Sequence, residues 1–231
     1  MSLILNIDTA TGNAHVSFAE NGQILQVRFN DTQKDHAAFL QTAIGELIQT
    51  TGIALQDLDA VAVTAGPGSY TGLRVGFASA KGLCYALQKP LISIGTLDVL
   101  TASALRVYKD IGEPMLFCPM IDARRMEVFT AIYQKDLALV LAPTPMILDA
   151  AAFEKELSQH KILFFGNGAD KWEQVCTHPN AYFKSVSIAP EAMSGRVNTL
   201  FSENNFTELA YSEPFYLKEF QIVTQKPHNN T

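Results

Sequence analysis

The same order of strands and helices occurs twice along the chain, and this repetition constrains the fold more than any other feature. In the first half, an apolar run at 3–9 and two alternating segments at 13–20 and 22–29 predict three strands. A helix comes next, followed by a strand at 59–66, a helix at 71–87, a strand at 89–95 and a helix at 96–108. The predicted order is therefore β-β-β-α-β-α-β-α.

The first helix is expected just after the third strand. Asp35 is placed to cap its start and Gly52 to end it, because a short polar side chain can accept from free backbone amides and glycine tolerates the left-handed conformation of a helix end. Four apolar residues give this segment its helical spacing: Leu40, Ile44, Leu47 and Ile48.

The second half begins the pattern again. Strands are expected at 114–123, 126–134 and 138–143, then a helix at 149–159, a strand at 161–166 and a helix at 169–176. A duplicated β-β-β-α-β-α topology predicts an α/β protein of the actin-like ATPase (ribonuclease H-like) superfold with two lobes. We expect the lobes at 1–108 and 109–231, joined within 106–114. Whether a last helix at 191–204 returns to the first lobe is open, and the tail from about residue 222 is expected to be disordered.

Composition and charge narrow the function classes. The 231 residues contain no run of 18 apolar residues, and the opening segment lacks the features of a signal peptide, so we expect a cytoplasmic protein. The formal net charge is -6, and Arg124 and Arg125 are the only adjacent basic residues, so the isolated chain is not expected to bind nucleic acid. Cys84, Cys118 and Cys176 form no CxxC pair and are expected to be structural thiols.

The glycine-rich stretch VAVTAGPGSYTGLRVG, residues 61–76, suggests a phosphate-binding turn at first sight. It lacks the lysine of a Walker A loop, the spacing of GxGxxG and the first glycine of GxSxG. A β-to-α turn remains, in which Ser69 or Thr71 caps the following helix. The amino end of such a helix could still attract an anion.

Small residues recur every four positions along that helix, at Gly72, Gly76, Ala80 and Cys84. Each glycine within a helix costs about 1 kcal/mol relative to alanine. Two of them on one face indicate that another helix approaches closely, either from within the fold or from a second chain. The second possibility makes this stripe a candidate partner surface.

Three turns are candidates for remnants of a nucleotide site. Asp8, Thr9 and Thr11 lie at the first hairpin, where either a phosphate loop or a capped hairpin turn is possible. In the second half, Asp122 stands in the matching turn, but Ala123, Arg124 and Arg125 replace the glycines that close phosphate approach needs. The Gly-Asn-Gly at 166–168 fits an adenosine turn, although a strand-to-helix turn explains it better.

Metal chemistry is not indicated by the histidines. No two of them are three or four residues apart, the spacing of a ligand pair on one helix. His36 is expected to be a polar residue in the first turn of its helix. The five histidines are His15, His36, His160, His178 and His228.

Several stretches together resemble the TsaB (YeaZ) family, the non-catalytic relatives of TsaD in the bacterial synthesis of threonylcarbamoyladenosine at position 37 of tRNA. The resemblance extends over almost the whole chain, and GSYTGLR sets this branch apart from the catalytic one. The motif turn contains Gly66, Gly68, Ser69, Thr71 and Arg74. The matching stretches are AGPGSYTGLRVG (65–76), LNIDTAT (5–11), ISIGTLDVL (92–100), MIDARRMEVFTAIY (120–133), FFGNGA (164–169) and EPFYLKE (213–219).

The resemblance implies a scaffold for TsaD rather than an enzyme. It implies pairing with TsaD through helices of the first lobe, TsaE in the assembled complex, a functional link to TsaC, and contact with tRNA only through the complex. No metal and no cofactor are expected, beyond weak or vestigial binding of ATP or ADP. A homodimer is predicted for the isolated chain. The residues assigned to partner binding are Leu40, Ile44, Leu47, Ile48, Gly72, Gly76 and Ala80.

Two other function classes stay open at this stage. A small kinase or an enzyme that transfers carbamoyl or acyl groups could use Asp8 and the turn at 66–72 to hold ATP. A peptidase is a weaker alternative, assembled from Ser69, His36 and Asp35. Nucleotide binding by the isolated protein distinguishes the first of these from a scaffold.

Overall fold

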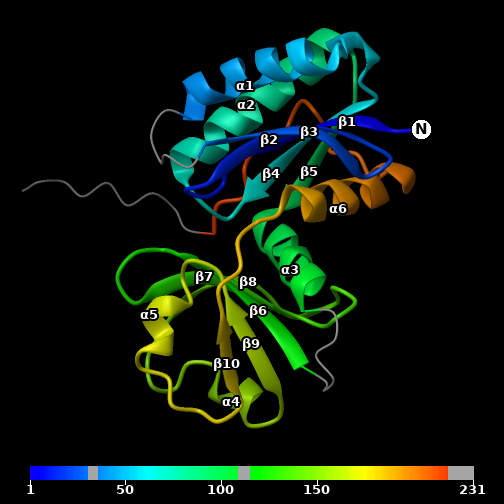
Figure 1. Ribbon diagram of the computed structural model, residues 1–231. Coiled ribbons are helices and arrows are strands. Elements are labelled where there is room, and N and C mark those ends of the chain that lie inside the picture. The colour runs from blue at the N-terminus through cyan, green and yellow to red at the C-terminus, as the bar shows by residue number, and fades with distance from the viewer. Residues whose placement is uncertain (31–35, 109–114, 218–231) are drawn as a thin grey trace, which may run out of the picture.

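The computed structural model describes residues 1–30, 36–108 and 115–217 and contains two five-stranded sheets (Figure 1). In the first, an antiparallel meander is extended by two parallel strands, in the order β3-β2-β1-β4-β5. The strands of this sheet are β1 (Leu3–Asp8), β2 (Ala14–Glu20), β3 (Gln23–Asn30), β4 (Ala60–Gly66) and β5 (Leu91–Gly95). These are the strands that the alternation and the apolar runs predict.

The second sheet has the same topology, with the order β10-β9-β6-β7-β8. The sequence analysis missed β10, a short edge strand that pairs in parallel with β9. The strands are β6 (Met115–Asp122), β7 (Glu127–Tyr133), β8 (Leu139–Ile147), β9 (Lys161–Phe165) and β10 (Ala181–Lys184). The duplicated α/β topology of the actin-like superfold is thereby confirmed.

The helices of the first half agree with the prediction, and two of the second half do not. Both α4 and α5 form a single turn, shorter than the segments 149–159 and 169–176. Phe153 explains the late start of α4: its backbone is left-handed (φ 59°), and its ring packs 5.2 Å from that of Phe164 in the core. The helices are α1 (His36–Thr51), α2 (Tyr70–Leu87), α3 (Thr96–Val107), α4 (Glu154–Leu157), α5 (Asp170–Glu173) and α6 (Pro190–Ser202), with a 3-10 turn at Leu55–Asp57.

Five layers follow one another through the molecule (Figure 1). Helices α1 and α2 cover the outer face of the first sheet, and α4 and α5 pack on the outer face of the second. Between the sheets lie α3 and α6: α6 packs against the first sheet, and α3 packs against both. In α6, Met193 and Val197 join the core of the first sheet, while Leu97 and Leu100 of α3 pack on the second. The last helix thus crosses back to the first half.

Some predictions fall on residues outside the described ranges: the cap at Asp35, most of the junction 106–114, the tail from about residue 222, and His228. Gly52, in contrast, ends α1 as expected, with a left-handed backbone (φ 71°) and its amide 2.9 Å from the carbonyl oxygen of Ile48. Within the described ranges, no helix combines the length and the apolar character that crossing a membrane requires.

Candidate functional site

The glycine-rich turn between β4 and α2 is held by the first hairpin. Ser69 caps α2, because its Oγ accepts a hydrogen bond from the amide of Gly72 at 3.3 Å. The Ser69 amide itself donates to the carbonyl oxygen of Ala10 at 2.7 Å. Thr71 is exposed and does not provide the cap. The expected β-to-α turn is confirmed, with Ser69 as its capping residue.

Glycines occur in this turn because other backbone segments lie against it. A Cβ atom at Gly68 would overlap the carbonyl oxygen of Ala10, and one at Gly72 would overlap that of Thr9. Gly66 has φ 116°, and a Cβ there would lie 2.6 Å from the carbonyl oxygen of Phe215. The chain's own carbonyl oxygens therefore fill the space beside these glycines, and carbonyl oxygens repel an anion.

The small-residue stripe of α2 packs inside the fold. A Cβ atom at Gly76 would overlap Oγ1 of Thr9, and it would lie 3.5 Å from Val63. Thr9 Oγ1 donates to the carbonyl oxygen of Gly72 at 2.7 Å, which ties the end of β1 to the helix. Of the two explanations for the stripe, close approach within the fold is the one observed, although the neighbour is the end of a strand rather than a helix.

The side chains assigned to partner binding require a correction. Leu40, Ile44 and Leu47 of α1 are at most 5% exposed, and they share a hydrophobic cluster with Ala80 beneath the two helices. Ile48 is half-buried against the same cluster. Gly72 and Gly76 face Thr9. These seven residues form the inner faces of α1 and α2. An apolar stripe at helical spacing usually faces the core of the same protein, which is why the sequence pattern selected them. Partner binding through helices of the first half stays a prediction.

Arg74, the last residue of the motif turn, connects α2 to the C-terminal segment. Its guanidinium lies 4.0 Å from the centre of the Tyr70 ring, and its Nε donates to the hydroxyl of Tyr216 at 3.2 Å. The amide of Phe215 donates to the carbonyl oxygen of Ala65 at 2.7 Å. The motif turn and the stretch EPFYLKE, far apart in sequence, therefore meet on the first sheet.

Asp8 is buried and engaged by the protein. Its Oδ1 accepts from Thr64 Oγ1 at 2.7 Å and from the amide of Ala10 at 3.0 Å. Its Oδ2 lies 3.6 Å from Nδ1 of the buried His15. Burial lowers the pKa of His15, because desolvation disfavours its charged form more than Asp8 and the more distant Glu191 favour it.

The first hairpin is thus a capped turn rather than an open phosphate loop. Asp8 and Thr9 are fully buried and make their hydrogen bonds within the chain. Of the three candidate residues, Thr11 is the one that lines the space between the halves, and its Oγ1 donates to the carbonyl oxygen of Asn13 at 3.4 Å. The structure therefore favours the second of the two alternatives left open for these residues.

The matching turn of the second half, residues 122–127, is organised by a lysine that the sequence analysis missed. Lys171 of α5 forms an ion pair with Asp122, and its Nζ also donates to the carbonyl oxygens of Arg125 at 2.8 Å and Glu127 at 2.6 Å. Asp122 Oδ1 accepts from the amide of Arg124 at 3.0 Å. Arg124 and Arg125 both adopt left-handed backbones (φ 71° and 50°).

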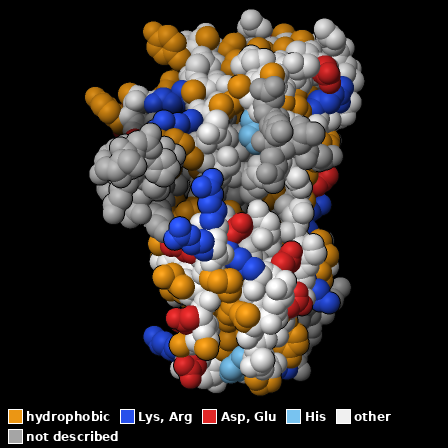
Figure 2. Space-filling model, turned by 90° about the vertical axis from the view of Figure 1, so that its left-hand side faces the viewer, with side chains coloured by type: hydrophobic (Ala, Val, Ile, Leu, Met, Phe, Trp, Pro, Cys, Tyr) orange, Lys and Arg blue, Asp and Glu red, His pale blue; other side chains and the backbone are white. Residues whose placement is uncertain are grey.

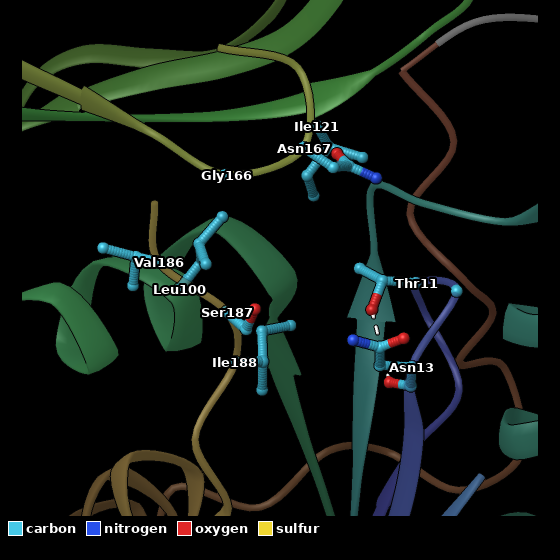
Figure 3. A pocket seen from close by; sticks show the side chains of 10 residues that line it. Thr11, Asn13, Leu100, Ile121, Gly166, Asn167, Val186, Ser187 and Ile188 are labelled. Atoms are coloured by element: carbon cyan, nitrogen blue, oxygen red, sulfur yellow. Dashed lines mark hydrogen bonds between the residues drawn. The ribbon is translucent and has the colours of Figure 1, made fainter. Parts of the chain in front are cut away.

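A cavity of about 200 Å³ lies between the halves (Figure 3). Thr11 and Asn13 stand on one side and Ser187 on the other, with Asn167 at one end. Among the described residues that line it there is no lysine or arginine, and ligand pockets usually enclose at least about 300 Å³. The described side chains that line this cavity therefore offer no cationic partner to a triphosphate.

The Gly-Asn-Gly turn follows from packing. Gly166 has φ 95°, and a Cβ there would overlap the carbonyl oxygen of Met120. A Cβ at Gly168 would lie 2.8 Å from Val128. Asn167 Oδ1 accepts from the amide of Asp122 at 2.9 Å, which joins this turn to the arginine turn. The interpretation as a strand-to-helix turn is confirmed.

The remaining candidates for chemistry do not assemble into a site. Across the described ranges, no three histidine, cysteine or acidic side chains come together in a way that could hold a metal ion. His36 is the first residue of α1, and its side chain is mostly buried. Ser69 Oγ serves as a helix cap and makes no hydrogen bond to His36 in the described structure, and Asp35 lies outside the described residues.

More than half of the chain matches one protein family. Residues 27–152 match the family of TsaD, described as tRNA N6-adenosine threonylcarbamoyltransferase. The tRNA threonylcarbamoyladenosine biosynthesis protein TsaB of Escherichia coli is 28% identical over 222 residues, 93% of this chain and 94% of that protein. TsaB of Bacillus subtilis is 29% identical over 176 residues, 74% of each. The solved structure of YeaZ from Pseudomonas aeruginosa is 26% identical and has a TM-score of 0.76, covering 94% of this chain and 100% of that one. The chain therefore belongs to the family of TsaD and, within it, to the TsaB (YeaZ) branch.

Proposed function

We propose that this chain is a supporting, non-catalytic subunit of the complex that forms N6-threonylcarbamoyladenosine at position 37 of tRNA in the cytoplasm. The names of its relatives support the pathway. One observation supports the non-catalytic role above all. The two turns that would hold phosphate in an actin-like ATPase are occupied by the chain's own groups, Asp8 and Thr9 in the first half and the Lys171 cluster in the second.

The catalytic partner in this proposal is TsaD, bound by the outer faces of α1 and α2. A Cβ atom at Gly45 of α1 or at Gly82 of α2 would have open space around it, in contrast to one at Gly72 or Gly76. Tyr85, one turn after Gly82, is 74% exposed. Small residues beside an exposed aromatic side chain suit close helix packing against another subunit. TsaE joins the assembled complex, and TsaC supplies the threonylcarbamoyl-adenylate.

The isolated chain uses the same faces to form a homodimer, which gives way to the heterodimer when TsaD is present. It needs no cofactor of its own, and ATP or ADP binds weakly or not at all. The uncharged lining of the central cavity supports this part of the proposal. Binding of ATP to the isolated protein with micromolar affinity would instead favour the kinase or transferase alternative.

A reconstitution tests the proposal directly. Unmodified tRNA, ATP, bicarbonate and threonine are incubated with TsaC, TsaD and TsaE from the same organism, with and without this chain, and the modified nucleoside is quantified. Product should form only when the chain is added, and the chain alone should form none. Equal product with and without it would overturn the proposal.

A further inference from the structure

We propose that the turn formed by Arg124 and Arg125 contacts phosphates of the tRNA backbone within the assembled complex. This inference rests on the proposed function, since it concerns the same substrate. Both arginine side chains are exposed. In the part of the chain that the structure describes, neither guanidinium has a hydrogen bond or an ion pair to the protein. Two adjacent, unpaired guanidinium groups are well suited to phosphate, because each can donate two parallel hydrogen bonds to it.

The surroundings of the turn keep these charges available. Asp122 and Glu127 are the acidic residues nearest to them in sequence, and Asp122 is already paired with Lys171. The ammonium of Lys171 donates to Asp122, to the carbonyl of Arg125 and to that of Glu127, so all three of its protons are engaged. Lys171 therefore neutralises the carboxylate of Asp122, and the turn 122–127 together with Lys171 keeps a positive formal charge even when Glu127 is counted.

The position of the turn exposes it to a large ligand. Asp122 is joined to Asn167 at the end of the central cavity, so the turn lies where the two halves meet. Figure 2 shows Lys and Arg side chains gathered at this waist of the molecule. The chain as a whole has a net charge of -6. A basic patch on an acidic protein, exposed beside a cleft, is better explained by a polyanion held mainly by another subunit than by solubility.

The two left-handed residues strengthen the argument. Non-glycine residues adopt this conformation rarely, and it costs free energy. Lys171 compensates this cost by binding the carbonyl of Arg125 and the carboxylate that caps Arg124. The result is a turn of fixed shape that presents two successive arginines to solvent, so little conformational freedom of the backbone remains to be lost on binding.

The test is the salt dependence of tRNA binding by the complex of this chain with TsaD and TsaE. The probe is an unmodified tRNA transcript, and its Kd is measured by fluorescence anisotropy between about 50 and about 200 mM salt. In the variant Arg124→Gln/Arg125→Gln, the slope of log K against log salt should fall by about 1 to 2, because up to two phosphate contacts are lost. Arg124→Lys/Arg125→Lys should keep the slope, because both charges remain.

A matched control removes two charges elsewhere. Lys155 and Lys184 are exposed in the same half, and Lys155→Gln/Lys184→Gln should leave the slope unchanged. A slope that falls equally in both Gln variants, or in neither, would overturn the inference. Weaker assembly of the Arg124→Gln/Arg125→Gln variant with TsaD, at unchanged tRNA slope, would also overturn it and would assign the turn to an acidic protein surface.

The outcome is separable from the proposed function. If wild-type chain does not increase product in the reconstitution, the proposed function is wrong and this inference falls with it. If wild-type chain is required but the slope is insensitive to Arg124 and Arg125, only the inference is wrong. Thermal unfolding of each variant, compared with that of Arg124→Lys/Arg125→Lys, separates loss of charge from loss of structure.

Discussion

At the scale of single residues, His15 is a titrating group held in a buried environment. It is 2% exposed, it lies beside Asp8, and burial lowers its pKa below the ordinary 6.5. In the unfolded chain it regains the ordinary value. The unfolded state therefore binds the proton more tightly than the folded state. Below about pH 6.5, the free energy of unfolding decreases as the pH falls.

We expect the free energy of unfolding to decrease on acidification from about pH 7 to about pH 5.5 because of His15, by at most about 1.4 kcal/mol per pH unit. Urea unfolding over this range should show a shallower decrease in His15→Gln, in which the titrating group is absent. His160→Gln changes an exposed histidine and serves as the control. Identical pH profiles for wild type and His15→Gln would contradict the assignment.

The three cysteines provide a second prediction at this scale. Burial raises the pKa of Cys84 to about 11, and it raises the pKa of Cys118 further. Cys176 is only half-buried. Since the thiolate is the reactive form, one thiol should react with a disulfide reagent at about pH 8 in the native protein. All three should react after unfolding in urea, and fast reaction of more than one native thiol would show that the core opens.

Local chemistry made some residues predictable and left others hidden. Ser69 could be identified as a cap because the amide that it caps, that of Gly72, is only three positions away. Lys171 could not, since its three acceptors lie 44 to 49 residues earlier in the chain. Asp8 was recognised as special, but its partner Thr64 is 56 residues away, and the sequence alone could not distinguish a ligand from a buried hydrogen-bond acceptor.

At the scale of secondary-structure elements, α2 carries glycines with two different purposes. Gly76 makes room for Thr9, and Gly82 has open space where its side chain would be. The sequence showed the four-residue stripe and correctly indicated close approach, but periodicity alone does not tell an internal neighbour from a second chain. The short length of α4 and α5 could not be predicted either, because tertiary packing of Phe153 and Trp172 overrides the helical propensity of the flanking residues.

The two glycines should respond oppositely to the same substitution. Gly76→Ala is expected to destabilise the protein by about 1 to 3 kcal/mol, because the new methyl group overlaps Thr9 and disturbs its bond to Gly72. Gly82→Ala should stabilise it by up to about 1 kcal/mol, since alanine is the better helix former and no atom obstructs it. Urea unfolding of both variants measures the difference, and a change of the same sign in both would refute this account.

At the scale of the whole molecule, the contacts between α3 and α6 hold the halves together. Arg196 of α6 forms two hydrogen bonds with Asp98 of α3, at 3.1 and 3.2 Å, and Ser103 Oγ accepts from the amide of Ala189 at 2.9 Å. The duplication of the topology was predictable from the order of elements. The positions of α3 and α6 between the sheets were not predictable, because both helices are amphipathic and their pattern does not say which sheet they cover.

Self-association gives a prediction at this scale. If the outer faces of α1 and α2 form the proposed homodimer, Gly82→Glu should convert it to a monomer, since a charged side chain would be buried where the helices approach. Sedimentation of both proteins at micromolar concentration measures the change. Gln159→Glu adds the same charge at an exposed position of the second half and should leave the dimer intact. A wild-type monomer, or a dimer in both variants, would refute the proposed interface.

The ammonium of Lys171 gathers three oxygen atoms at the second turn, much as a bound cation gathers its ligands. Unlike a cation, it is covalently attached to the chain, so dilution, chelation or a change of ionic composition does not remove it. The arginine turn therefore keeps its shape from one ionic environment to another. A surface built in this way is ready before its ligand arrives, which suits a subunit whose contribution is a fixed geometry.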